Sequence, residues 1–305
     1  MTEDWIESYI KAGKAVITAK KLAEKIVKPG FLYLELATLC EDEILNQGCE
    51  LAFPINISLN EIAAHYSPTI DDETVVPPKG LLKIDLGAHY EGYIADSAFT
   101  ININNDKLLQ NYIDAAEEGL EAAIAKFKPG TKLYELGEVI AEKIISHGLR
   151  PIVNLGGHEL KRYNLHAGPF IPNFRDTSHN QTLKVGDSYA CEPFATSGVG
   201  KVANGNQSYI FRFVRKVKKD LSIKDRDFRN KIEKITKRLP FSPRLLEKNG
   251  IEKQEVIRII NKFLRKKILD NYPILIERSG EPVAQQEHTI IIDMDGNPIV
   301  ITREN

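Results

Sequence analysis

Apolar residues recur at helical spacing in two long stretches of the chain, Glu3–Val27 and Gln110–Phe127. Each stretch is followed by Lys-Pro-Gly, which is a turn sequence, and then by a second helical segment. The second segments end at Gly48 and Gly148, as helix C-termini often do. The pattern therefore predicts two pairs of helices. In the first stretch, large apolar side chains near helical spacing are Trp5, Ile6, Tyr9, Ile10 and Val16.

The two helix pairs are copies of one another in sequence. Lys28–Gly48 and Lys128–Gly148 share seven of 21 residues at an offset of 100. The similarity continues to His65 and His166, each with a proline three residues later. Chance similarity between two Leu/Glu-rich helices is the alternative, and the matching histidines argue against it. We predict an α/β fold with internal pseudo-two-fold symmetry and a site where the halves meet.

Short strand-like segments follow each helix pair. Leu81–Gly87 and Tyr93–Ile103 form a predicted hairpin around Tyr90-Glu91-Gly92. The corresponding strands of the second half are Ser188–Pro193 and Tyr209–Val217, and strands at His288–Asp293 and Ile299–Thr302 close the chain around a turn at Asp295–Pro298.

A basic block separates the strands of the second half. The formal net charge of the chain is −1, yet residues 212–267 hold 20 Lys and Arg against 7 Asp and Glu. Charge segregation of this size indicates regions with different roles. Three helices are predicted here, at Asp225–Arg238, Pro243–Lys248 and Lys253–Leu269. We therefore expect a catalytic domain of residues 1–218 plus 272–305 and a basic helical insertion of residues 219–271.

Composition narrows the class of protein. With 305 residues and 42% hydrophobic content, the chain is typical of a globular protein. No apolar run approaches the ~20 residues of a membrane helix, and the acidic N-terminus differs from a signal peptide, so we expect a cytoplasmic protein. The three cysteines, Cys40, Cys49 and Cys191, lack metal or disulfide spacing and are interpreted as buried hydrophobes.

Several acids stand at unusual places for solvent-exposed carboxylates. Asp85 lies inside an apolar strand and Asp96 follows eleven residues later. Glu192 and Glu287 adjoin apolar strands of the second half, and His158 follows two glycines. A carboxylate that faces a core needs a partner or a metal ion. Taken singly, each acid is better explained as a strand-end residue in water. The prediction of a functional site therefore rests on the four acids and His158 together.

The set resembles the metal-binding signature of methionine aminopeptidases, specifically the type 2 group of archaea and eukaryotes. The motifs cover essentially the whole chain: Phe53-Pro54, Ala63-Ala64-His65-Tyr66, Ile84-Asp85-Leu86-Gly87, Ala95-Asp96-Ser97-Ala98, Gly157-His158, Glu192-Pro193-Phe194 and Glu287-His288-Thr289. The helical insertion before the last strands also matches type 2. The resemblance implies the pita-bread fold, which agrees with the internal repeat.

The resemblance further implies two divalent metal ions. Asp85 and Asp96 would be ligands, His158 and Glu192 would bind one ion, and Asp96 and Glu287 would bridge both. The charges agree, because four carboxylates and two divalent cations sum to zero. Oxygen and nitrogen donors suit Co²⁺, Mn²⁺, Fe²⁺ or Zn²⁺.

The implied reaction is removal of the N-terminal methionine from nascent polypeptides, with a small second residue preferred. A metal-bridged hydroxide would attack the peptide carbonyl, with Glu192 as proton acceptor. His166 would stabilise the oxyanion, and His65 would contact the scissile amide nitrogen. Phe53, Leu165 and Tyr272 would line the methionine pocket, although ordinary core packing explains Leu165 equally well.

Two alternatives remain open at this point. One is an Xaa-Pro aminopeptidase or prolidase with the same fold, which generally has an N-terminal domain ahead of its first ligand. The other is a non-catalytic protein that binds RNA or ribosomes through the basic insertion, for example through Arg215, Lys218 and Lys219. We expect a monomer without membrane contact. Contact of the insertion with ribosomal RNA is a hypothesis, and a solvated helical face paired with the acidic remainder of the protein explains the charges at least as well. Gln286 departs from the family, which commonly carries an aromatic there, so packing beside Glu287 is expected to differ.

Overall fold

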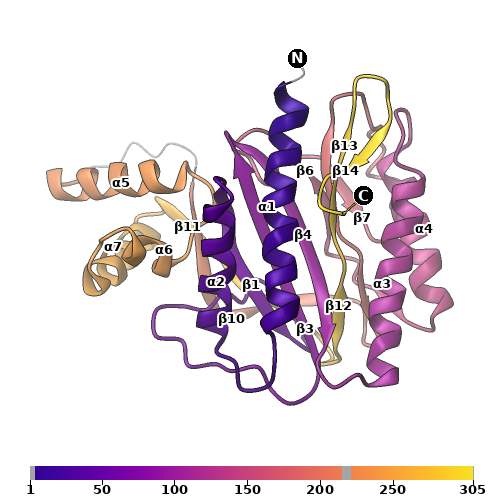
Figure 1. The fold of residues 1–305 in the computed structure, drawn as a ribbon, viewed down its shortest axis with the longest axis horizontal. Helices are drawn as coiled ribbons and strands as arrows, with labels where there is room; N and C mark the ends of the chain where they lie inside the picture. The colour runs from indigo at the N-terminus through magenta and orange to yellow at the C-terminus, as the bar shows by residue number, and fades with distance from the viewer. Residues whose placement is uncertain (1–3, 215–220, 305) are drawn as a thin grey trace.

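The computed structural model describes residues 4–214 and 221–304. Four helices lie together over the strands (Figure 1). They are α1 (Asp4–Ile26) and α2 (Tyr33–Asn46) of the first half, and α3 (Lys107–Ala125) and α4 (Leu133–Ser146) of the second. All four helices were predicted; the predicted start at Glu3 lies outside the described residues.

The sequence repeat is also a repeat of backbone structure. Gly30 and Gly130 open the second helix of each pair with φ of +84° and +91°. Their N–H groups donate to equivalent carbonyls, Val76 at 2.8 Å and Leu183 at 2.9 Å. Because few residues other than glycine adopt this left-handed conformation at low cost, both Pro-Gly turns require glycine here. Chance similarity does not produce such matched geometry, so the pseudo-two-fold prediction is confirmed.

The first half contains the predicted hairpin. β3 (Leu81–Tyr90) and β4 (Tyr93–Asn102) pair along their whole length, and β1 (Glu50–Leu59) pairs with the other edge of β3. Neither β1 nor β2 (Ile62–Ala64) was predicted from the sequence.

Strand β3 has two faces of different character. Leu82, Ile84 and Leu86 are fully buried in the core formed with α1 and α2. Lys83 and Asp85 alternate with them and therefore point to the opposite face. The Lys83 ammonium donates to the carbonyls of Asn60 and Val283, each at 2.9 Å, and its burial lowers its pKa to about 7. The buried hydrogen bonds of Lys83 thus fix the polar face of β3 against the segments around Asn60 and Val283.

In the described residues, three further sheets contain the remaining strands. The largest has the order β14-β13-β8-β6-β7, with Pro298–Val300, His288–Ile292, Ser188–Cys191, Gly156–Glu159 and Phe170–Pro172. Another joins β12 (Val283–Gln285), β9 (Phe194–Thr196) and β5 (Arg150–Pro151), and the third joins β10 (Val202–Phe213), β11 (Leu269–Glu277) and β2.

The repeat does not extend to a second hairpin. The strand expected at Ser188–Pro193 pairs with β13 and β6, whereas the strand expected at Tyr209–Val217 pairs with β11. The reason is that Phe194–Thr196 leaves for another sheet immediately after β8. The end of the predicted Tyr209–Val217 strand lies outside the described residues.

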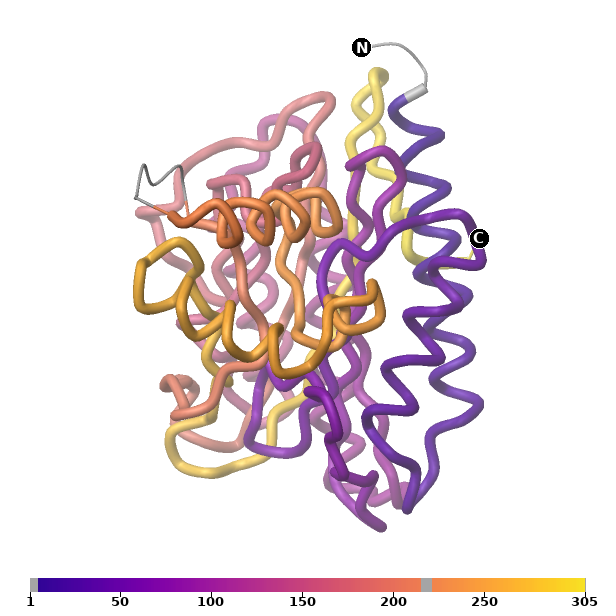
Figure 2. The backbone as a smooth tube through the Cα atoms, turned by 90° about the vertical axis from the view of Figure 1, so that its left-hand side faces the viewer, coloured from indigo at the N-terminus to yellow at the C-terminus, as the bar shows by residue number. Residues whose placement is uncertain are grey.

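The basic block forms three helices between β10 and β11: α5 (Ile223–Thr236), α6 (Pro243–Lys248) and α7 (Lys253–Arg265). They project to one side of the molecule, which faces the viewer in Figure 2. They share an apolar core that includes Phe241, Val256 and Phe263. A hydrogen bond of 3.0 Å from the Val214 N–H to the Ile268 carbonyl closes the block at its base. The predicted boundary at residue 218 lies outside the described residues.

Two further predictions concern residue environment. All three cysteines are free and buried, and burial raises the pKa of Cys40 to about 12. In residues 4–214 and 221–304, no helix combines the length and apolar character needed to cross a membrane.

Candidate metal centre and substrate cavity

A cavity of about 220 Å³ opens between the two halves. Its walls include every residue that the sequence singled out for metal binding, catalysis or methionine recognition: Phe53, His65, Asp85, Asp96, His158, Leu165, His166, Glu192, Tyr272 and Glu287. These residues come from segments up to 234 positions apart. The predicted candidates therefore occupy one site.

The first half contributes two aspartates from neighbouring strands. In the β3–β4 ladder, Gly87 is opposite Asp96 and Asp85 is opposite Ala98. Asp85 and Asp96 are thus diagonal neighbours on the same face of the hairpin, within reach of a common ligand. Asn56 of β1 donates from its amide to Asp85 Oδ2 at 3.4 Å. Asp85 Oδ1 is buried without a hydrogen-bond partner in the described part of the chain.

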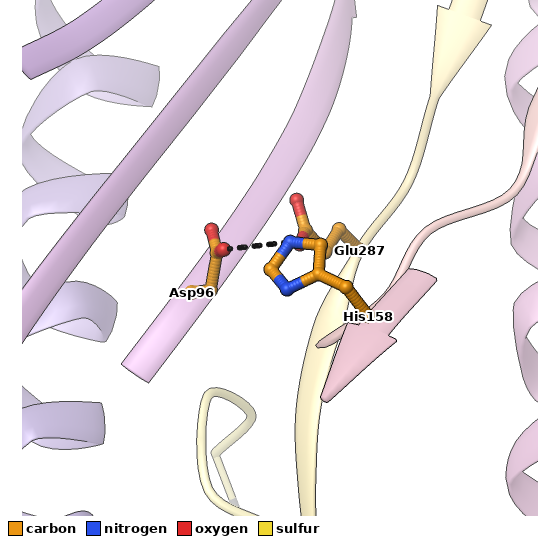
Figure 3. A group of neighbouring side chains, drawn as sticks. All are labelled: Asp96, His158 and Glu287. Carbon is orange, nitrogen blue, oxygen red and sulfur yellow. Dashed lines mark ion pairs between the residues drawn. The ribbon is translucent and has the colours of Figure 1, made fainter. Parts of the chain in front are cut away.

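The second half contributes the remaining donors. His158 lies on β6, Glu192 directly follows β8 and Glu287 directly precedes β13. His158 Nε2 is 3.6 Å from Asp96 Oδ2 and 3.7 Å from Glu192 Oε1. Asp96, His158 and Glu287 each offer a ligand atom within 4.8 Å of the other two, and their side chains converge in Figure 3.

Hydrogen bonds between β4 and the segment around β13 fix the relative positions of these carboxylates. Thr289 Oγ1 accepts from the Asp96 N–H at 2.8 Å and donates to the Asp96 carbonyl at 2.7 Å. Ser97 Oγ donates to the Glu287 carbonyl at 2.7 Å, and the Glu287 N–H donates to the Ala98 carbonyl at 2.9 Å. The two halves of the site are therefore joined through the backbone of the acids themselves.

Gln285 is a functional candidate that the sequence analysis missed. Its buried amide Nε2 donates to Glu192 Oε2 at 3.2 Å and to Glu287 Oε2 at 3.3 Å. A carboxylate can only accept, so the amide nitrogen must face both acids. The sequence feature that could have identified Gln285 is its position as a polar residue at the end of the buried segment Val-Ala-Gln, two positions before Glu287.

The electrostatics of the carboxylates call for cations. Burial raises the pKa of Asp85 to about 7. Burial, and then repulsion from neighbouring acids, raises the pKa values of Asp96, Glu192 and Glu287 well above their usual range. Burial lowers the pKa of His158 to about 4, so its ring is neutral and can be a ligand. An unpaired buried carboxylate oxygen beside three further acids and a neutral imidazole fits a site for divalent metal ions.

Two more histidines, His65 and His166, line the cavity, and each lies near the ring of Tyr272. The ring centroid of Tyr272 is 5.3 Å from that of His65 and 6.0 Å from that of His166. His65 Nδ1 lies 3.1 Å from the Pro273 carbonyl, and burial lowers the pKa of His65 to about 4. Because a carbonyl only accepts, Nδ1 carries the proton and Nε2 is left with a free lone pair.

His166 stands closer to the metal ligands. Its ring centroid is 4.4 Å from that of His158. Desolvation by the cavity walls, and then the neighbouring His158 and His65, lower the pKa of His166 well below its usual value. His166 as a whole residue is exposed to solvent. A neutral imidazole here still has one N–H to donate to a substrate.

The apolar part of the cavity is bounded by Phe53 and Leu165, which share a buried cluster. Gly87 of β3 makes room for Phe53, because a Cβ at Gly87 would lie 2.2 Å from the Phe53 ring. Gln286 is buried, and its backbone N–H donates to the Pro193 carbonyl at 3.3 Å. The effect of its departure from the family's aromatic residue stays a prediction.

Residues 7–225 match the family described as metallopeptidase family M24. The chain belongs to metallopeptidase family M24. Relatives of known function are similar over almost the whole chain. The methionine aminopeptidase of Methanothermobacter thermautotrophicus is 40% identical over 97% of this chain and 98% of its own, and that of Pyrococcus abyssi is 40% identical over 98% and 99%. The similarity to these archaeal enzymes confirms the resemblance to type 2 methionine aminopeptidases.

Similarity to solved structures confirms the fold. The chain covers all of its own length and 98% of the methionine aminopeptidase from Thermotoga maritima, with a TM-score of 0.73 and 23% identity. A thermophilic Arx1 gives a TM-score of 0.86 at 15% identity, with 92% of that chain covered. The pita-bread architecture predicted for this M24 chain is therefore confirmed, and at these identities the likeness concerns the fold alone.

Proposed function

We propose that the cavity between the halves is the active site in which this metallo-aminopeptidase removes the N-terminal methionine from polypeptides. The observation that carries the proposal is the convergence of Asp96, His158 and Glu287 within 4.8 Å, beside Asp85 and Glu192, in an apolar-walled cavity. The names of the relatives that are 40% identical agree with it, and they favour this activity over that of a prolidase.

Five residues are proposed to hold two divalent metal ions: Asp85, Asp96, His158, Glu192 and Glu287. By the resemblance to methionine aminopeptidases, Asp96 and Glu287 would serve both ions. When bound, a pair of such ions activates a water molecule and polarises the scissile carbonyl. The O/N donor set suits Co²⁺, Mn²⁺, Fe²⁺ or Zn²⁺, and the sulfur of Cys191 is buried outside the set.

The protein's own groups handle the protons. We assign Glu192 as the base that takes the proton of the attacking water and returns it to the leaving amine. Gln285 donates to Oε2 of Glu192 and so directs the Oε1 atom toward His158 and the cavity. His166 donates its remaining N–H to the carbonyl oxygen of the substrate, a contact of the type that is worth about 3 kcal/mol in the transition state.

His65 is assigned to the other side of the scissile bond. Its Nδ1–H is held by the Pro273 carbonyl, so Nε2 accepts from the N–H of the scissile amide. The contact orients the peptide, because its N–H reaches this nitrogen in only one orientation of the amide plane. Phe53, Leu165 and Tyr272 are proposed to surround the methionine side chain, and the limited cavity volume favours a small second residue such as Ala, Gly or Ser.

The test is release of methionine from Met-Ala-Xaa peptides after metal loading, compared with release from Xaa-Pro dipeptides. We expect release from the first set, and its loss in Asp96→Ala and Glu287→Ala. Preference for the proline substrates would reject the methionine assignment. Undiminished release in either variant would reject the two-metal assignment.

We further propose that the basic insertion, residues 219–271, contacts ribosomal RNA near emerging nascent chains, with the enzyme acting as a monomer in the cytoplasm. Arg215, Lys218 and Lys219 lie outside the described residues. Among the described ones, Lys231, Lys234 and Lys237 line a groove that shares Pro240 with the substrate cavity. Such lysines suit phosphate groups and give salt-dependent binding.

The ribosome contact is tested by reversing the charges of Lys231, Lys234 and Lys237 together. We expect sedimentation with ribosomes to be lost at about 0.1 M salt, while release of methionine from short peptides stays unchanged. Ribosome binding that survives the reversal would reject the contact. Size-exclusion chromatography with light scattering checks the monomer, whose mass is 34.3 kDa.

A further inference from the structure

A buried arginine of the insertion reaches into the catalytic domain. Arg244 of α6 is 7% exposed, and its guanidinium forms a salt bridge with Glu41 of α2, which is 4% exposed. The Nε atom of Arg244 is 3.4 Å from Glu41 Oε2, and Nη2 donates to Glu41 Oε1. Two donor groups thus meet the two oxygens of one carboxylate.

The same guanidinium also binds the segment that follows His65. Arg244 Nη1 donates to Ser67 Oγ at 2.8 Å and to the carbonyl of Pro68. Ser67 Oγ in turn donates to the Ile55 carbonyl at 2.7 Å, and the Ile55 N–H donates to Glu41 Oε1 at 3.2 Å. The four residues around Arg244 therefore form one closed network that joins α6, α2, β1 and the 65–68 segment.

His65 needs such support, because its backbone has φ of +69°. A residue with a Cβ is strained by roughly 1–2 kcal/mol in this left-handed region, so the conformation persists only where the surrounding structure holds it. On one side the ring is held by the Pro273 carbonyl, and two residues downstream the chain is held by Arg244.

We infer that Arg244 is a positioning residue for catalysis: by anchoring Ser67 and Pro68, it holds His65 Nε2 toward the substrate. The inference rests on the role proposed for His65. It gives the insertion a part in the chemistry, since the anchoring group comes from α6 while the histidine comes from the catalytic domain. Lysine cannot replace it, because one ammonium group cannot match the carboxylate, the hydroxyl and the carbonyl in this planar arrangement.

The kinetic test uses Arg244→Lys and Glu41→Gln with a matched control, Lys248→Gln. Lys248 is an exposed residue of the same helix and pairs with Asp42, the neighbour of Glu41. We expect Arg244→Lys and Glu41→Gln to lower kcat for a Met-Ala-Xaa peptide by about tenfold or more, with KM and metal affinity changed less than about twofold. The control should leave all three values unchanged.

A double-mutant cycle separates positioning from general damage. In a His65→Ala background, we expect Arg244→Lys to change kcat by less than about twofold, because its effect passes through His65. An equal loss of kcat in both backgrounds, or a parallel loss of metal affinity, would show a structural role only and overturn the inference. So would an unchanged kcat in Arg244→Lys, or full activity in His65→Ala alone.

A second measurement does not depend on activity. In the metal-free protein, the ring resonances of His65 observed by NMR should shift in Arg244→Lys, while those of His147, at the end of α4, stay in place. Unshifted His65 resonances would overturn the inference even if the enzyme released methionine normally. If Arg244→Lys failed to fold, Glu41→Gln would be used for the same comparison.

Discussion

At the residue scale, the neutral side chain of Gln285 holds two carboxylates of the site, Glu192 and Glu287, in place. The Gln285 amide is 1% exposed and donates to Glu192 and Glu287 at once. It orients both carboxylates while adding no charge that would compete with a cation. Hydrogen-bond partners of this kind commonly decide metal affinity as much as the ligands do.

Replacing Gln285 by leucine should therefore weaken divalent metal binding by about 10–100-fold, which calorimetric titration would measure. Gln286→Leu is the matched control, because its carboxamide makes no hydrogen bond to either carboxylate in the described part of the chain. Equal metal affinity in the Gln285 variant and the wild type would contradict the assigned role.

The raised carboxyl pKa values predict a particular pH dependence of the metal-free protein. A carboxyl whose pKa is higher in the folded than in the unfolded chain stabilises the fold at low pH and loses that contribution as pH rises through the folded value. For Asp85 the folded value is about 7, and Asp96, Glu192 and Glu287 shift the same way. We expect the melting temperature of metal-free protein to fall from pH 6.5 to about pH 7, above which Lys83, whose folded pKa is about 7, acts in the opposite direction.

His65 and His158 do not contribute to the change in stability above pH 6.5. Their folded pKa values are lowered to about 4, so they affect stability only below their ordinary value of 6.5. Metal ions should reverse the trend, because the bound ligands are already deprotonated. Differential scanning calorimetry with and without metal checks both statements, and a melting temperature that rises with pH in the metal-free sample would contradict the first.

At the element scale, the site lies on a seam between strands of opposite halves. β4 and β13 are joined through Thr289 and Ser97, whose hydroxyls bond to backbone groups of Asp96 and Glu287. The sequence predicted both strands and all the acids on them. It did not predict the seam, because period-two patterning says which face of a strand is buried and not which distant strand it meets.

Thr289→Val should remove the two hydrogen bonds that the Thr289 hydroxyl makes to the Asp96 backbone, while it keeps the shape of the side chain. The Asp96 N–H would then be buried without a partner, which costs about 1–3 kcal/mol of unfolding free energy. Denaturant unfolding measures this loss. Thr177→Val, at an exposed loop position, is the control and should change stability by less than about 0.5 kcal/mol.

Other elements escaped prediction for related reasons. Short strands such as β5 and β9 have two or three residues, too few for any periodicity. The segment Glu50–Leu59 was missed as a strand because seven consecutive residues in it are buried, which removes the alternation. The Arg244 network was out of reach because Arg244 and Glu41 are 203 residues apart, and both are ordinary surface residues by type.

At the scale of the whole molecule, the two halves are joined by the ends of the chain. Helix α1 of the first half packs against the C-terminal segment, where a Cβ on Gly13 would meet the Ile301 carbonyl oxygen at 2.0 Å. Ile301 is buried in the same core as α1. The internal repeat predicted two halves, whereas this contact requires knowing how they are placed.

Gly13→Ala should therefore destabilise the protein by about 1–3 kcal/mol, in spite of the higher helix propensity of alanine. Gly119→Ala, in the repeat-equivalent helix α3, is the control: its Cβ would have only ordinary contacts, the nearest at 3.5 Å. We expect it to be neutral or to stabilise by about 0.5–1 kcal/mol. Thermal unfolding of the two variants gives the comparison, and equal stability would contradict the packing.

The hydrogen bond between Val214 and Ile268, which closes the insertion where it joins β10 and β11, bears on how the insertion could have been added to the fold. Because Val214 already bonds to Ile268, an Asn-Gly turn could replace everything between them and leave β10 and β11 paired as a simple hairpin. An ancestor without the three helices could thus have had the same core and the same carboxylates. It would have lacked Arg244, so the histidine at residue 65 would have been held less firmly. The insertion would thus be easy to gain topologically, and the contacts of its arginine would make it costly to lose.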